Sequence, residues 1–107
     1  MLDFYMIEDV ETTWQEPNEE KYIGGLTLAQ HATLSGVWTI AKKNGISLVF
    51  FSDSRLDSRQ TQCLNRIINS VPMSTSSSSF FIESIGKLSV IVEQAILKKC
   101  GIITFCD

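Results

Sequence analysis

The sequence predicts a single domain of the α/β or α+β class, with about three helices packed on one small sheet. Three observations lead to this prediction. The chain has 107 residues, a length that suits one hydrophobic core. Apolar residues follow helical spacing in three segments, and three shorter apolar segments have the composition of strands. Hydrophobic residues make up 44% of the chain, so we expect residues 1–107 to fold rather than to remain disordered.

The strand-like segments lie at the two ends of the chain and near its middle. Residues 2–9, LDFYMIED, and residues 102–106, IITFC, are rich in aromatic and aliphatic side chains. Between them, ISLVFF at 46–51 is apolar at nearly every position, which predicts a central strand that is buried on both faces. The segment YIGGLT at 22–27 contains two consecutive glycines, which permit a turn before the first helix.

Three helices are expected between these strands. The first runs from a cap at Thr27 to about Lys43, and the second from Asp57 or Ser58 to Asn69. The third runs over about 84–100 and has the widest apolar face, so we expect the sheet to cover it. Its apolar residues are Ile85, Leu88, Ile91, Val92, Ala95 and Ile96.

Two polar segments connect these elements. Residues 73–79 are rich in serine and are expected to form a flexible connector. Residues 10–21 form an acidic loop, and seven of the twelve acids of the chain precede Lys21, its first base. A concentrated negative charge suits a basic partner, whereas the alternative is a solvated loop that only maintains solubility. The acidic total argues against a nucleic-acid binder.

The cysteine and histidine content predicts neither a metal site nor a bound cofactor. The three cysteines, Cys63, Cys100 and Cys106, lack Cys-x-x-Cys spacing, and His31 is the single histidine. For His31 we expect a packing or surface role. No apolar run is long enough to cross a bilayer, and no secretory signal is visible, so we expect a cytoplasmic protein that does not bind membranes.

The stretch VFFSDSR predicts a strand end followed by a turn at 52–55. Functional side chains concentrate on loops at strand ends, so Asp53 and Arg55 are candidates for a specific polar contact. Trp14, in the acidic loop, is a candidate for either local packing or an interface contact. The candidate partner-binding residues are therefore Glu8, Asp9, Glu11, Trp14, Glu16, Glu19, Glu20, Asp53 and Arg55.

Four short segments, MLDFYMIED, YIGGL, FFSDSR and CGIITFCD, occur in an order that resembles small bacterial immunity proteins of toxin–immunity systems, including contact-dependent growth inhibition. The resemblance implies a cytosolic protein that binds one cognate toxin domain, often a basic nuclease, and blocks it. It implies no catalytic residues, because such a protein acts by binding.

Two other functional classes remain open from the residues alone. The first is a small enzyme that uses the turn at 52–55, although no Gly-x-Ser-x-Gly motif accompanies its serines. The second is an oligomeric structural module that associates through a sheet edge. The sequence leaves the oligomeric state open.

Overall fold

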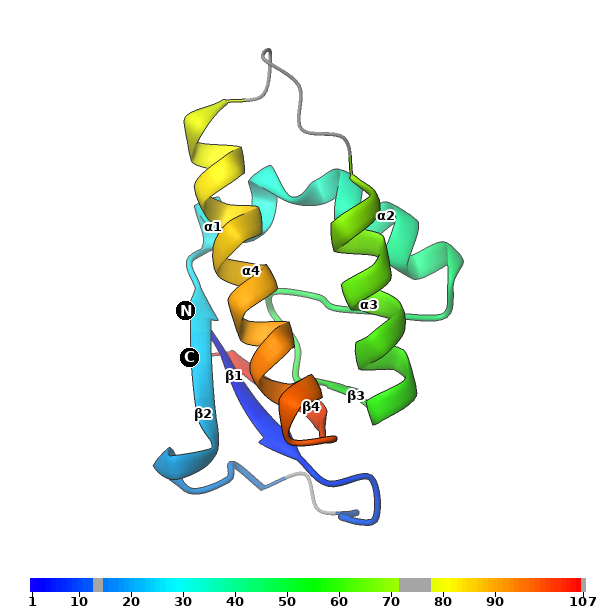
Figure 1. The fold of residues 1–107 in the computed structure, drawn as a ribbon. Coiled ribbons are helices and arrows are strands. Elements are labelled where there is room, and N and C mark those ends of the chain that lie inside the picture. Colours follow the sequence, from blue (N-terminus) through cyan, green and yellow to red (C-terminus); the bar gives the residue numbers. More distant parts are fainter. Residues whose placement is uncertain (13–14, 72–77, 107) are drawn as a thin grey trace.

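The computed structural model of the protein describes residues 1–12, 15–71 and 78–106. In these residues it contains one four-stranded antiparallel sheet and four α-helices, which confirms the predicted fold class (Figure 1). The strand order is β2-β1-β4-β3. The strands are β1 (Leu2–Ile7), β2 (Tyr22–Leu26), β3 (Ser54–Leu56) and β4 (Gly101–Cys106). The helices are α1 (Leu28–Thr33), α2 (Ser35–Lys43), α3 (Ser58–Ser70) and α4 (Ser79–Leu97), and a short 3-10 helix, η1, spans Glu19–Lys21.

The two ends of the chain form the centre of the sheet. Strands β1 and β4 pair over six residues each, from Leu2 opposite Cys106 to Ile7 opposite Gly101. The prediction that both terminal strands belong to the single sheet is confirmed, and the termini lie close together (Figure 1). Long-range antiparallel pairing therefore closes the domain.

The prediction of a central, fully buried strand at 46–51 is wrong. This segment has no strand pairing, and only alternate residues are buried: Val49 is 48% exposed and Phe51 is 72% exposed. The sheet edge beside β4 is occupied instead by the short strand β3, with Ser54 opposite Thr104. Ile46, Leu48 and Phe50 belong to the main core, whereas the residues at 47, 49 and 51 are exposed, so the segment has one buried side. The predicted turn at 52–55 is also partly wrong, because Ser54 and Arg55 belong to strand β3.

The predicted helix from Thr27 to Lys43 is divided in two at Leu34, whose backbone leaves the helical region with ψ of 17°. Thr27 caps α1 as predicted, through a capping box with Gln30. At the division, the indole N–H of Trp38 donates to the carbonyl of His31 at 2.7 Å. The same carbonyl also accepts from the Leu34 N–H at 3.2 Å, so a backbone donor and a side-chain donor both bond to it at the break.

Helix α4 begins earlier and ends earlier than the predicted 84–100. Ser78 caps it by accepting a hydrogen bond from the Phe81 N–H, so the helix starts within the predicted serine-rich connector. Residues 73–77 of that connector lie outside the described residues. The helix ends at Leu97, and Lys99 then takes a left-handed backbone conformation with φ of 56°.

The YIGGL segment forms strand β2 rather than a simple turn. The pairing of β1 with β2 shifts register between Phe4 and Tyr5, beside Gly24, which has φ of 141°. A Cβ atom at Gly24 would lie 2.7 Å from the Ile91 side chain of α4. Glycine therefore permits both the irregular backbone and the close approach of the helix.

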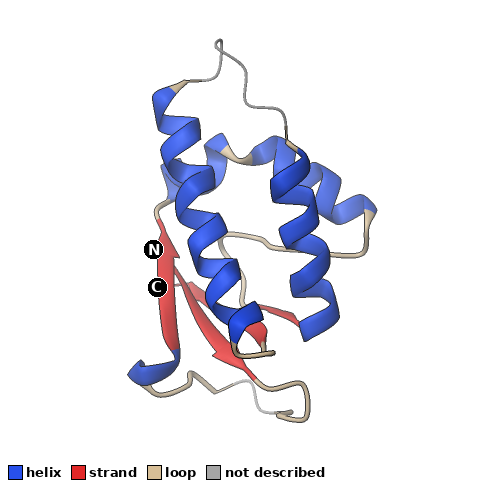
Figure 2. Ribbon diagram, in the orientation of Figure 1, coloured by secondary structure: helices blue, strands red, loops and turns tan. Residues whose placement is uncertain are grey.

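The main core lies between the sheet and the helices (Figure 2). Leu88, Val92 and Ala95 of α4 are fully buried in it, as predicted. Because side chains alternate along a strand, β1 directs Leu2 and Phe4 into this core and its intervening residues to the opposite face. That outer face has a small apolar cluster composed of strand residues, namely Tyr5, Ile7, Ile103 and Phe105.

Candidate functional site

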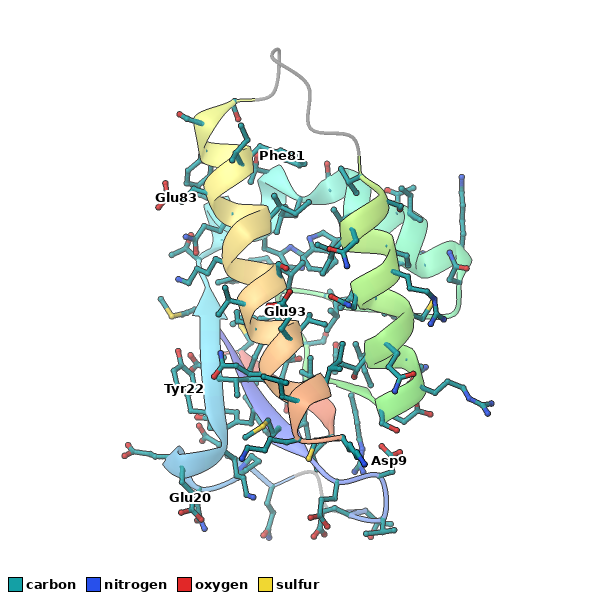
Figure 3. The ribbon with its side chains drawn as sticks, in the orientation of Figure 1. Asp9, Glu20, Tyr22, Phe81, Glu83 and Glu93 are labelled. Atoms are coloured by element: carbon teal, nitrogen blue, oxygen red, sulfur yellow. The ribbon has the colours of Figure 1, made fainter. Side chains whose placement is uncertain are left out.

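The acidic residues of the segment after β1 gather at one end of the molecule, which we call the acidic end. Figure 3 shows Asp9 and Glu20 at this lower end, far from Phe81 and Glu83 at the start of α4. The acidic end is formed by the segment that leaves β1 and returns through η1 into β2. Its acids are Glu8, Asp9, Glu11, Glu16, Glu19 and Glu20.

A groove of about 290 Å³ lies within the acidic end. Among the described residues that line it, Glu8, Glu11 and Glu16 are acidic, and Lys21 is the one lysine or arginine. The structure thus brings together three candidate residues that are spread over nine positions in the sequence. Their common environment favours a cationic group over an anionic one.

Glu16 also holds the acidic loop against the sheet. The hydroxyl of Tyr5 donates a hydrogen bond to the Glu16 carboxylate. Tyr5 is only 7% exposed and lies on the outer face of the central strand β1. This contact attaches the loop to the sheet at Glu16, one of the three glutamates that line the groove.

Asp9 has a structural role in this arrangement. Its carboxylate accepts hydrogen bonds from the hydroxyl and from the backbone N–H of Ser58, the first residue of α3; the N–H contact is 2.7 Å. These two bonds lower the pKa of Asp9 below its ordinary value, and nearby Arg55 adds to the effect. The positive N-terminal end of the α3 dipole also stabilises an anion at this position. Asp9 therefore links the end of β1 to α3.

Asp53 and Arg55 do not form one site. Arg55 Nη2 donates to the carbonyl of Glu8 at 3.1 Å, so this side chain joins the acidic end. Asp53 instead accepts a hydrogen bond of 3.4 Å from the N–H of Cys106, which faces Leu2 at the far end of β1. Between them Ser54 is buried in β3. Trp14, the remaining candidate, lies outside the described residues.

A second hollow, of about 360 Å³, is lined by Asp3, Tyr5, Glu19 and Tyr22. Of these, the sequence-based site included only Glu19. Asp3 and Tyr5 are two residues apart on β1, a spacing that predicts a common face. Their proximity to Tyr22, however, depends on the register between β1 and β2, in which Tyr5 is opposite Tyr22. Strand pairing of this kind is not visible in the sequence.

His31 has a packing role, as the sequence predicts. Its ring stacks on Trp38 with centroids 4.7 Å apart, and its Nε2 lies 3.2 Å from the carbonyl oxygen of Leu48. Since a carbonyl only accepts, Nε2 carries the proton. Partial burial lowers the pKa of His31, and the hydrogen bond to Leu48 opposes that effect. The contact ties the segment 46–51 to helix α1.

Within the part of the chain that the structure describes, no group of three or more His, Cys, Asp or Glu side chains is placed to hold a metal ion. No helix in the same residues combines the length and the apolar character needed to cross a membrane. No family model, curated protein or solved structure matches the chain. The function must therefore be inferred from the geometry of the acidic end.

Proposed function

We propose that this chain is a cytoplasmic immunity protein that binds and neutralises a cognate bacterial toxin domain, such as a basic nuclease. One observation carries the proposal: the glutamates at positions 8, 11 and 16 converge on a single groove at the acidic end. The order of short segments that resembles immunity proteins supports the same function.

The acidic end provides the electrostatic complementarity that a basic partner needs. Opposite charges on two surfaces speed their diffusional encounter and disfavour partners of the wrong charge. Because the acidic loop is tied to the sheet through Tyr5 and Glu16, its charges are largely placed before the partner arrives. A surface organised in advance loses less conformational entropy on binding.

The size of the domain is compatible with such a complex. An interface of ordinary size takes roughly 800 Å² from each partner. That area is about an eighth of the 6200 Å² surface of the domain. Inhibition by binding requires no catalytic residue in the immunity protein. It requires only that the bound toxin domain can no longer act on its substrate.

The direct test has two steps: identify a candidate toxin domain from the neighbouring genes of the native host, then measure protection of cells that produce it. Co-expression should restore growth, and the two purified proteins should form a complex of defined stoichiometry in size-exclusion chromatography. A catalytically inactive toxin serves as the binding partner in the second assay. If the chain neither restores growth nor binds the inactive toxin, the proposal is wrong.

The exposed apolar residues beside β3 favour one alternative, an oligomeric module. In the segment that precedes this edge strand, Val49 is about half exposed and Phe51 is largely exposed, and exposed edges pair readily with other chains. Multi-angle light scattering over a hundredfold range of concentration distinguishes the two functions. A constant monomer mass excludes the module, whereas a dimer that Phe51→Ser dissociates supports it.

A further inference from the structure

We propose that the hollow lined by Asp3, Tyr5, Glu19 and Tyr22 binds a lysine or arginine side chain of a protein partner. The identity of that partner rests on the proposed function, whereas the cation site itself rests on the geometry of these four residues. The site lies on the outer face of the sheet, beside the acidic loop.

Two tyrosines line the hollow; Tyr22 supplies its accessible aromatic wall, and Tyr5, which is 7% exposed, packs against Tyr22. Tyr5 of β1 and Tyr22 of β2 are opposite each other in the sheet, with ring centroids 5.4 Å apart and planes inclined by 67°. Tyr22 is 42% exposed, so its ring is accessible to a ligand, and Figure 3 shows it at the outer margin of β2. The face of an aromatic ring carries partial negative charge and attracts cations.

Two carboxylates complete the hollow. Asp3 lies on the same face of β1 as Tyr5, and Glu19 comes from the short helix η1. All four described residues that line the hollow are thus acidic or aromatic. Anions are repelled by this set, whereas an ammonium or guanidinium group gains contacts with both kinds of side chain. The apolar stem of a lysine or arginine can pack along a ring.

Gly25 leaves room for this arrangement. It is opposite Asp3 in the sheet, and a Cβ atom there would lie 2.9 Å from the Tyr22 hydroxyl and 3.1 Å from Asp3 Oδ1. Any larger residue would force these two groups to shift. The hydrogen bond from Tyr5 to Glu16 similarly fixes the second ring and adds another carboxylate nearby. The hollow is therefore built by the fold and does not depend on flexible surface residues alone.

The test is a nuclear magnetic resonance titration of the isotope-labelled chain with N-acetyl-lysine methylamide, N-acetyl-arginine methylamide and tetramethylammonium chloride. Sodium chloride at the same ionic strength is the reference. We expect the lysine or arginine analogue to give saturable shifts at Asp3, Gly25 and the Tyr22 ring, with a Kd on the order of 10–100 mM. Shifts equal to those in sodium chloride would overturn the proposal. So would saturation by tetramethylammonium alone, because it would indicate a small quaternary ammonium ligand.

Variants separate the cation site from general charge effects. Tyr22→Phe keeps the ring and should change the Kd by no more than about twofold, whereas Tyr22→Leu should weaken binding about fivefold or more. Glu19→Gln, in the exposed helix η1, should also weaken binding without disturbing the sheet. Glu83→Gln removes an equal charge at the opposite end and should have no effect. Equal binding by wild type, Tyr22→Leu and Glu19→Gln would contradict the site. The titration uses no toxin, so its result tests the cation site independently of the immunity function.

Discussion

Asp9 and Ser58, which are 49 positions apart, are joined by two hydrogen bonds from the hydroxyl and backbone N–H of Ser58 to the Asp9 carboxylate. The contact closes the end of β1 onto the first turn of α3, where backbone N–H groups lack helical partners. The helix thus has two carboxylates at its N-terminus, since Asp57 is its capping residue. A residue that the sequence predicts as a partner-binding acid therefore also supports the fold.

We predict that Asp9→Asn lowers the free energy of unfolding at pH 7 by roughly 0.5–1 kcal/mol, a small value because the group is exposed. The lowered pKa of Asp9 means that its stabilising effect is complete above the ordinary value of 3.8 and is lost as the pH falls through the folded-state pKa. Urea unfolding at pH 7 and near pH 3 measures the difference, which should shrink at the lower pH. Glu11→Gln is the control and should remain within about 0.5 kcal/mol of wild type. If Glu11→Gln lost as much free energy of unfolding as Asp9→Asn, the effect would arise from the change in net charge.

His31 should make stability depend on pH in the mildly acidic range. Burial lowers its pKa, so the folded protein takes up the proton less readily than the unfolded chain. Its contribution is therefore complete above the ordinary value of 6.5 and declines as the pH falls through the folded-state pKa. His31→Gln retains a donor for the Leu48 carbonyl but does not titrate. The urea midpoint of this variant should change less between pH 7.5 and 5.5 than that of wild type. Parallel pH profiles would refute the assignment.

Replacing Gly101 and Gly86 with alanine should change the free energy of unfolding in opposite directions, because only Gly101 is closely packed against backbone atoms. A Cβ atom at Gly101 would lie 2.1 Å from the carbonyl oxygen of Leu56, because β3 and α3 meet the start of β4 there. Gly101→Ala should therefore cost about 2–3 kcal/mol or more. Gly86, inside α4, has no neighbouring atom within 4 Å of such a Cβ, so Gly86→Ala should stabilise the chain by about 0.5–1 kcal/mol. Thermal unfolding of both variants gives the comparison, and a tolerated Gly101→Ala would show that β3 can move away.

The charges of the acidic end should govern the rate at which a toxin associates. Replacing Glu11 and Glu20 with glutamine should slow association about tenfold at low ionic strength and flatten its salt dependence. The matched control replaces Glu83 and Glu93, two exposed acids of α4, and removes the same charge. Stopped-flow association at several salt concentrations provides the measurement. Equal rates in the two double variants would mean that only net charge matters. Glu16 is left intact because its bond to Tyr5 supports the loop.

Features that depend on neighbouring residues can be predicted from the sequence. The sequence predicts the start of α3 at Asp57 or Ser58, and Asp57 forms a reciprocal capping box with Gln60, three positions away. The apolar face of α4 likewise follows from helical periodicity, which places Leu88, Val92 and Ala95 on one side. The concentration of acids before Lys21 is also a property of the sequence alone.

The pairing of segments and the contacts between distant side chains become visible only in the folded chain. The six-residue pairing of β1 with β4 joins residues about a hundred positions apart, and the strongly apolar segment 46–51 lies outside the sheet. The approach of Tyr22 to Tyr5 follows from strand register, and the contact of Asp9 with Ser58 follows from the position of α3 on the sheet. Composition records how apolar or polar each segment is. Pairing depends on the competition among all such segments for the same sheet edges, and that competition is resolved only when the whole chain folds.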